Sequence, residues 1–447
     1  MANKFLTFII LFGLSLSAWG KDEQVLPIQH WTLANGAQVY FVESHELPLV
    51  DLNLSFRAGS AYDGRHPGIA SYTARMLAQG TKHLSADDIA EKFDNVGAIY
   101  SHSTSRDSAD ISLRSMSDEA YFNPAVATFT DIINHPNFPS TAANRVKQQL
   151  LQALKYQQQH PSTVATLAFY HDLYQNNPYG HNPLGNAKQI KNISPHDLAR
   201  FYKHHYNGAN TVVAIVGDLS LAKAKTLSQQ LVGRLPKGEL ASLPPLTMKT
   251  TASLQQHIEF PSTQTSVRIG NIAIARSSPD YIPLTVGNHI LGGNVLTSRL
   301  FAAVREQRGL TYDVASRFSP MQEKGPFMVS MQTRNDKTTE AIAVTKDQIK
   351  QFVQQGPTAK ELQSAKQNII GGFPLSFSSN ASITNMISAI GFYELPLDYL
   401  DTYRGKVDAL SQQDITQAFQ QHIDPDKLLT VTVGAAVASQ SNTTTNG

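Results

Sequence analysis

Few residue patterns in this sequence could carry out catalysis by themselves. The chain has no cysteine, which excludes a thiol nucleophile, a cysteine-ligated zinc site, a disulfide scaffold and an iron–sulfur cluster. It contains no G-x-S-x-G, Walker A or G-x-G-x-x-G pattern. His204 and His205 are adjacent, so on a helix they do not share a face, and we expect surface residues rather than metal ligands.

One stretch has the spacing of a helix that could present side chains to a site. Apolar and small residues at i, i+3, i+4, i+7 and i+8 predict a buried stripe, entered through Pro67-Gly68. The stripe consists of Ile69, Tyr72, Thr73, Met76 and Leu77. A different face of the same helix carries Ser71, Ala74, Arg75 and Ala78.

The segment around this helix resembles a known family. Ala58 to Ser85 (AGSAYDGRHPGIASYTARMLAQGTKHLS) is similar to the zinc-helix region of the pitrilysin/insulinase metallopeptidases (M16), which have roughly G-[LI]-A-H-x-x-E-H-M-L-x-x-G-T. The matches in register are Gly68-Ile69-Ala70, Met76-Leu77 and Gly80-Thr81. Asn177 to Gly180 (NPYG) resembles the family's H-P-Y-G turn. The resemblance extends over residues 25 to 436.

The zinc-binding positions of the family motif are occupied here by other residue types. The two histidine positions hold Ser71 and Arg75, and the glutamate position holds Ala74. In the motif, imidazoles at i and i+4 bind one Zn²⁺ and the glutamate polarises the attacking water. The third ligand, a downstream glutamate, falls in Thr141 to Gln159, and no acidic residue occurs between Asp131 and Asp172. We therefore expect no metal ligand, no catalytic residue on this helix and no cofactor on this chain.

The second half of the sequence resembles the other part of the family's site. Leu296 to Leu300 (LTSRL) and Val304 to Tyr312 (VREQRGLTY) are similar to the family's S-R-L…R-E-x-x-G-L-x-Y stretch. The resemblance implies that Arg305 and Tyr312 face a zinc across a cleft, where they hold the substrate backbone and the oxyanion. A guanidinium and a phenol are suitable donors for that role. The alternative is that Arg305 pairs on a helix surface and Tyr312 is a half-buried strand residue.

The elements that must position these residues occur twice along the chain. Alternating patterns predict three strands per half, Val50 to Phe56, Asp107 to Arg114 and Thr211 to Val216, then Thr265 to Ile274, Gly325 to Thr333 and Leu428 to Val433. Helical patterns occupy Asn123 to Asn134 and Ser140 to Gln159, then Lys337 to Gln355 and Thr358 to Ile370. Tyr281 to Val304 is predicted as mostly helical, with an interruption at Gly292-Gly293. The repeat predicts an α+β protein of two homologous mixed α/β domains, the duplicated M16-type fold, facing each other across a cleft.

The bounds of the signal peptide, the two domains, the linker and the tail are predicted from local composition. Lys4, the apolar stretch Phe5 to Ala18 and the small-x-small sequence Ala18-Trp19-Gly20 predict a signal peptide over residues 1–20, cleaved near Gly20. The first domain is expected at 21–233 and the second at 247–436. The Gly- and Pro-rich residues 234–246 are the predicted linker, and the polar residues 437–447 a disordered tail.

Charge and hydrophobicity restrict the partners of this 447-residue chain. Lys plus Arg number 37 and Asp plus Glu 35, so we expect no binding to nucleic acid through bulk charge. No later stretch approaches 18 apolar residues, so no stable membrane anchor is expected. With the signal peptide, and with zero cysteines suited to an oxidising compartment, a periplasmic location is predicted.

Two functions from different classes fit these observations. The resemblance favours the non-catalytic, substrate-binding subunit of a heterodimeric M16 zinc peptidase that hydrolyses peptides. A partner subunit with His-x-x-Glu-His would then supply the zinc, and this chain would be inactive alone. The alternative is a stand-alone peptide-binding or structural pseudo-peptidase. An active enzyme with displaced ligands is disfavoured by the acid-free stretch Thr141 to Gln159.

Overall fold

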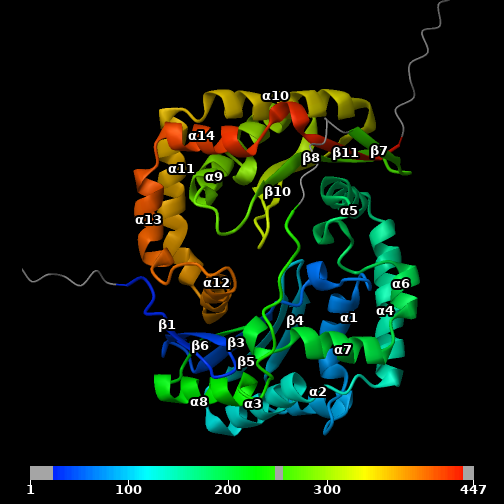
Figure 1. Cartoon of the computed structure of the whole chain (residues 1–447). Helices are drawn as coiled ribbons and strands as arrows, with labels where there is room; N and C mark the ends of the chain where they lie inside the picture. Colours follow the sequence, from blue (N-terminus) through cyan, green and yellow to red (C-terminus); the bar gives the residue numbers. More distant parts are fainter. Residues whose placement is uncertain (1–23, 247–254, 436–447) are drawn as a thin grey trace, which may run out of the picture.

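The computed structural model describes residues 24–246 and 255–435 (Figure 1). The predicted signal peptide, the predicted tail and the first residues of the second predicted domain lie outside the described residues. None of the described helices combines the length and apolar character needed to cross a bilayer. The chain forms a first half, residues 24–246, and a second half, residues 255–435, each built on one sheet.

The first half contains a six-stranded sheet in the order β1-β2-β6-β3-β5-β4. β2 and β6 run parallel, and the other neighbours are antiparallel. Because side chains alternate along β3, Leu52 and Leu54 pack into the core of this half, while Asn53 lies on the opposite face. The bounds are β1 (Gln29–Thr32), β2 (Gln38–Glu43), β3 (Leu49–Phe56), β4 (Ile99–Thr104), β5 (Ala109–Met116) and β6 (Thr211–Gly217).

The second half contains a five-stranded sheet in the order β7-β11-β8-β10-β9. This is the order of the first sheet without β1, and the parallel pair β7–β11 corresponds to β2–β6. The predicted internal repeat is thereby confirmed, strand by strand. The bounds are β7 (Gln255–Glu259), β8 (Gln264–Ile274), β9 (Thr311–Phe318), β10 (Gly325–Arg334) and β11 (Leu429–Gly434).

Most helices cover one face of the sheet in their own half (Figure 1). In the first half these are α1 (Ile69–Met76), α2 (Ala86–Asp94), α3 (Glu119–Asn134), α4 (Ser140–Gln158), α6 (Ala187–Asn192), α7 (Pro195–His205) and α8 (Leu221–Val232). In the second half they are α9 (Tyr281–Asn288), α10 (Thr338–Gln355), α11 (Ala359–Gly372), α13 (Tyr399–Ala409) and α14 (Gln412–His422).

Two helices are exchanged between the halves. α5 (Pro161–Tyr174) belongs to the first half but packs on β8 and β11 of the second sheet, while α12 (Asn380–Phe392) of the second half packs on β3 and β6 (Figure 1). The contacts are apolar, with Phe169 against Val431 and Ile387 against Ala214 in two shared clusters. The exchange explains why β6 and β11 are buried along their whole length, since both faces of each strand are covered.

Some local expectations were wrong. The stretch Tyr281 to Val304 is mostly helical, as predicted, but it consists of α9 followed by the π-helical segments η5 (His289–Gly293) and η6 (Phe301–Glu306), and its interruption begins just after Gly293. Gly292 is required by close packing, because a Cβ there would lie 2.5 Å from Ser316 Oγ. The helix predicted from Asn123 begins at Glu119, because Asp118 accepts a hydrogen bond from the Ala120 backbone N–H at 2.8 Å.

Candidate functional site

The start of α1 is held by a buried carboxylate. Asp63 accepts hydrogen bonds from the backbone N–H groups of Gly68 (2.6 Å) and Ala70 (2.9 Å), and His181 Nε2 lies 2.9 Å from its Oδ2. Burial raises the pKa of Asp63, although these hydrogen bonds oppose the shift. Gly68 has φ +96°, and a Cβ there would lie 2.6 Å from the Leu184 carbonyl oxygen. The local sequence therefore fixes where the helix begins.

The face of α1 that corresponds to the family's zinc positions does not fit a zinc ion. Ser71 and Ala74 are buried, whereas the predicted stripe had placed them on a separate face; α1 is enclosed almost all round. Arg75 is half-buried; burial of His102 on β4, with a smaller contribution from the positive charge of Arg75, lowers the pKa of His102. Arg75 carries a fixed positive charge, and Ser71 and Ala74 have neither a metal-binding nitrogen nor a carboxylate. These three residues therefore cannot replace the two imidazoles and the general base of the family's zinc site. α4, where the third ligand would lie, contains no acidic residue.

Arg305 and Tyr312 are brought together in the second half. The Arg305 Cζ lies 4.8 Å from the ring centroid of Tyr312 and 4.8 Å from that of Phe301. Tyr312 is 80% exposed, so the expected alternative of a half-buried strand residue is wrong. Among the described residues, none forms a hydrogen bond or ion pair with either functional group. Both groups are therefore free to donate to a ligand.

A turn between the two residues produces this pairing. Gly309 has φ +59°, and its N–H donates to the Arg305 carbonyl oxygen at 2.8 Å. Leu310 N–H donates to the Val304 carbonyl oxygen at 2.9 Å, so the chain reverses at the end of η6 and enters β9 beside it. Arg308 donates to the Ala303 carbonyl oxygen at 2.8 Å and acts as a cap. The R-E-x-x-G-L-x-Y spacing thus corresponds to a local turn that brings the Tyr312 ring next to the Arg305 guanidinium.

Tyr312 also lines a cavity of about 380 Å³ at the junction of the halves. Arg268 of β8 lies in it, and donates to Ser162 Oγ at 2.6 Å and Thr166 Oγ1 at 3.0 Å, both on α5. Burial lowers the pKa of Arg268 to about 10, so it stays charged at neutral pH. The sequence analysis did not single out Arg268. The available signal was that Arg268 is the single charged residue in the predicted strand Thr265 to Ile274.

A second cavity, of about 460 Å³, lies between β3, β4 and β5 of the first half and α12 of the second. Its lining is polar: Asp110 accepts hydrogen bonds from Ser55 (2.5 Å) and Ser108 (2.6 Å). Burial raises the pKa of Asp110, although these bonds oppose the shift. The predicted cleft between the halves is thus lined by both, with serine hydroxyls and carboxylates as its polar groups.

The buried carboxylate of Asp107 forms hydrogen bonds with residues of both halves. It accepts them from the hydroxyls of Tyr179 (2.5 Å) and Tyr393 (3.1 Å) and from the Gln322 backbone N–H (2.8 Å). Burial raises the pKa of Asp107, and the three bonds oppose the shift. Tyr179 belongs to the NPYG turn, whose role here is structural. Sequence analysis missed Asp107, which it treated as the start of a strand.

The two adjacent histidines differ in environment. His204 is exposed, as predicted, but the expectation was wrong for His205, which is buried with Nδ1 3.2 Å from the Arg57 carbonyl oxygen. Burial, with a smaller contribution from His204, lowers the pKa of His205 to about 4. His205 packs against the Tyr62 and Phe201 rings and is a neutral core residue at physiological pH.

Comparisons with known proteins agree with the duplicated fold and with the replaced zinc positions on α1. Residues 38–187 match the family model described as Insulinase (Peptidase family M16), and residues 192–369 match Peptidase M16 inactive domain. Non-peptidase homolog YmxG of Helicobacter pylori is 27% identical over 394 residues, 87% of this chain and 90% of that protein. A crystal structure of a peptidase M16 inactive domain from Pseudomonas fluorescens is 39% identical with a TM-score of 0.89, covering 92% of this chain and 99% of that one.

A protease structure from Helicobacter pylori shares the fold, at 18% identity and a TM-score of 0.82, over 91% of this chain and 99% of that one. One family assignment follows from the duplicated sheets, the two matched family models and the replaced zinc positions. This chain belongs to the M16 (insulinase) peptidase family, as a non-catalytic member without the family's zinc site.

Proposed function

We propose that this chain is the substrate-binding, non-catalytic subunit of a heterodimeric zinc peptidase. A partner subunit of the same family, with an intact His-x-x-Glu-His helix, would supply the zinc, the base and the attacking water. Arg305 and Tyr312 would complete the composite site. The observation that carries this proposal is the pairing of the half-buried Arg305 with the exposed Tyr312 in a chain whose own α1 does not fit zinc.

The pair is suited to stabilise negative charge on a peptide carbonyl. The guanidinium of Arg305 lies over the Phe301 and Tyr312 rings, which restrict its movement, so its N–H donors need little rearrangement when a ligand arrives. Donors that are already in place for a developing oxyanion contribute most to catalysis. The Tyr312 hydroxyl adds a second donor beside the first.

The position of Tyr312 also suits the binding of an extended peptide. β9 is an edge strand, paired only with β10 among the described strands. The outer side of an edge strand keeps N–H and C=O groups that can pair with a peptide backbone. A peptide bound along β9 would bring one of its carbonyl groups next to Tyr312. β4, next to Arg75, is the corresponding edge of the first sheet.

Reconstitution tests the composite site. The purified chain should cleave no peptide, whereas a mixture with a His-x-x-Glu-His chain from the same organism should form a heterodimer that cleaves quenched fluorescent peptides. The control is this chain with Arg305→Ala and Tyr312→Phe, which should assemble with the partner but fail to activate it. If the partner alone is as active as the mixture, the composite site is wrong. A peptide-binding chain that forms no heterodimer would support the stand-alone alternative.

We also propose export to the periplasm, on the strength of the apolar stretch Phe5 to Ala18 and the Ala18-Trp19-Gly20 sequence that follows it. N-terminal sequencing of the protein from a periplasmic extract should find a new terminus near Lys21. Retention of Met1 on protein confined to the cytoplasmic fraction would contradict this.

A further inference from the structure

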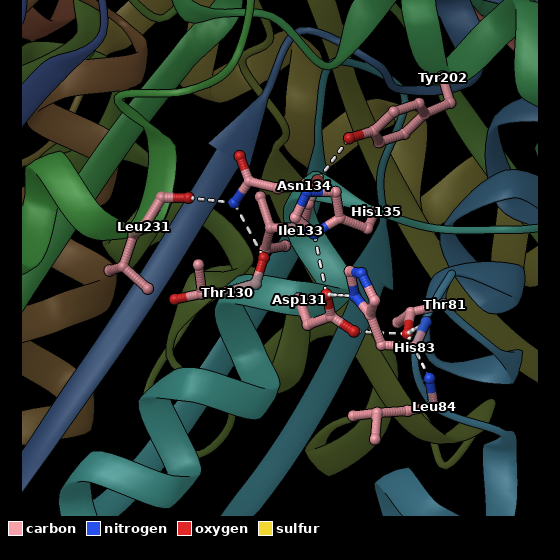
Figure 2. Close-up of polar contacts among 10 residues, drawn as sticks. All are labelled: Thr81, His83, Leu84, Thr130, Asp131, Ile133, Asn134, His135, Tyr202 and Leu231. Carbon is pink, nitrogen blue, oxygen red and sulfur yellow. Dashed lines mark hydrogen bonds and ion pairs between the residues drawn. The ribbon is translucent and has the colours of Figure 1, made fainter.

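Three potential metal ligands meet on the surface of the first half, and none of them occupies a zinc position of the family motif. Asp131 lies in the last turn of α3 and His135 directly follows that helix, so the two share a face at i, i+4. His83 lies in the loop between η2 (Leu77–Gln79) and α2. One nitrogen from each imidazole and one carboxylate oxygen lie within 4.8 Å of one another. Figure 2 shows both imidazoles directed at the carboxylate.

The distances within the cluster are short. Asp131 Oδ1 lies 2.6 Å from His83 Nδ1 and 2.8 Å from His135 Nδ1. The two imidazole rings are nearly perpendicular, with centroids 5.1 Å apart. In a metal site, an ion bonded at about 2.0–2.2 Å would replace the two N–H···O contacts, and in a tetrahedral arrangement the nitrogen–oxygen separations would widen by roughly 0.5–1 Å. Side chains as exposed as His83 can make that adjustment.

The surrounding structure holds the cluster in place. Thr81 Oγ1 donates to Asp131 Oδ2 at 2.5 Å and accepts from the backbone N–H groups of His83 and Leu84. Lys82 N–H donates to the His135 carbonyl oxygen at 2.9 Å, which ties the loop to the end of α3. Figure 2 also shows Asn134 bound to the Leu231 carbonyl oxygen. A second shell of this kind orients ligands before a metal binds.

The charge and exposure of the cluster suit an ion that enters from solvent. The carboxylate of Asp131 accepts hydrogen bonds from Thr81, His83 and His135, an arrangement that favours its charged form. The exposed side-chain fractions are 61% for His83, 31% for His135 and 14% for Asp131. One side of the cluster is therefore open for an ion and its water.

We propose that His83, Asp131 and His135 bind a divalent transition metal ion of the Zn²⁺ class, with water in the remaining position. Two imidazoles and one carboxylate suit Zn²⁺, Co²⁺, Ni²⁺ or Cu²⁺, whereas Mg²⁺ and Ca²⁺ prefer oxygen ligands alone. None of the three ligands is Ser71, Ala74 or Arg75, so this is not the family's peptidase site. The ion would clamp the loop after α1 to the end of α3, two segments 48 residues apart.

Zinc titration of the full chain, made without a histidine tag and stripped with a chelator, tests the site. The wild type should bind one Zn²⁺ per chain by calorimetry and show a zinc-dependent rise in Tm. His83→Ala should weaken binding at least tenfold, since losing even a second-shell partner typically costs about 10–100-fold. His171→Ala is the matched control, because His171 is 73% exposed and pairs with Asp172 at 3.0 Å without a third ligand. It should bind as the wild type does.

Two further measurements separate loss of a ligand from loss of structure. His83→Ala should keep the wild-type circular dichroism spectrum and the Tm of the metal-free protein, because His83 lies in an exposed loop. Co²⁺ added to the wild type should give the visible absorption of a four-coordinate ion, and His83→Ala should not. Absence of saturable binding by the wild type would overturn the proposal. Equally tight binding by the double variant His83→Ala/His135→Ala would do so too, by locating the ion elsewhere.

Discussion

Tyr312 presents its hydroxyl at an 80% exposed position, and Arg305 holds the ring from one side. Large aromatic residues at such exposed positions contribute little to stability, so this arrangement suits a contact with something outside the chain. On α1, in contrast, the side chains of Ser71 and Ala74 are buried, and the half-buried Arg75 carries a fixed positive charge. At the scale of single residues, the zinc positions on α1 are therefore largely enclosed, whereas the Tyr312 side chain is accessible.

Tyr312→Phe in the reconstituted heterodimer should lower kcat by about 10²–10³ and leave KM nearly unchanged, because the oxyanion exists only in the transition state. Arg305→Ala should cost at least as much, and it also removes packing of the aliphatic stem. Steady-state kinetics on a quenched peptide measures both effects, and gel filtration shows whether the variants still assemble.

The matched controls are Tyr121→Phe, at an exposed tyrosine of α3, and Arg308→Ala, which removes only a cap on the Ala303 carbonyl. Both should retain kcat within about twofold, since neither group touches the proposed substrate position. The assignment of Arg305 and Tyr312 fails if Tyr312→Phe keeps the wild-type kcat while Arg308→Ala abolishes it.

At the scale of secondary-structure elements, one ion pair positions the segment that carries Arg305. Arg299 forms two hydrogen bonds of 2.7 Å with the carboxylate of Glu361, and donates to the Gly356 carbonyl oxygen at 3.0 Å. Glu361 also completes the capping box of α11 with Thr358. The Arg299 of the S-R-L stretch thus anchors the start of η6 to the start of α11.

Glu361→Gln should destabilise the protein in a pH-dependent way. Partial burial raises the pKa of Glu361, but hydrogen bonds from Arg299 and Thr358 outweigh it and lower the pKa to about 2. The stabilisation is therefore complete above the unfolded-state pKa of about 4.5, and is lost as the pH falls towards 2. After allowance for solvent screening, we expect a loss of about 1–2 kcal/mol at pH 7.

Urea unfolding of the wild type and Glu361→Gln at pH 7 and pH 3 measures this loss, which should shrink by more than half at pH 3. Glu340→Gln, in the exposed pair Lys337–Glu340, is the control and should change stability by less than about 0.5 kcal/mol at either pH. A loss that is the same at both pH values would show that Glu361 stabilises the fold through its shape and not through its charge.

At the scale of the molecule, the exchange of α5 and α12 makes each half complete the core of the other. The Asp107 cluster and the bonds from Arg268 to α5 add polar contacts to the apolar ones. An interface made of core helices resists sliding, because its close-packed side chains leave little room for rearrangement. This is consistent with a subunit that presents a preformed binding surface to a partner.

Ile387→Ala on α12 should therefore destabilise the first sheet, in the other half of the chain. Ile387 is fully buried against β6, and such truncations typically cost about 2–5 kcal/mol. Hydrogen exchange followed by mass spectrometry should show faster exchange in peptides covering residues 211–217. Ile349→Ala, equally buried but in the second half's own core, should leave those peptides unchanged. Identical exchange patterns in the two variants would contradict the role assigned to α12.

Several features were predictable because their causes are local. Strand alternation, helix starts such as Thr358 and the spacing from Arg305 to Tyr312 each depend on residues within a few positions of one another. The replaced zinc positions were equally visible, since an alanine or an arginine cannot act as an imidazole in any fold. From such signals the duplicated α+β fold, the family and the missing zinc site could be predicted.

Other features depended on segments that only the tertiary structure brings together. The need for glycine at position 292 comes from its close approach to Ser316, and the buried His205 lies 3.2 Å from the Arg57 carbonyl oxygen. The sequence of α12 has no local signal that identifies the sheet it will cover. In the same way, Asp131 and His135 form a visible i, i+4 pair, but His83 joins them from 48 residues away. Local patterns record periodicity and capping, whereas long-range partners are decided by how complete elements pack around a shared core.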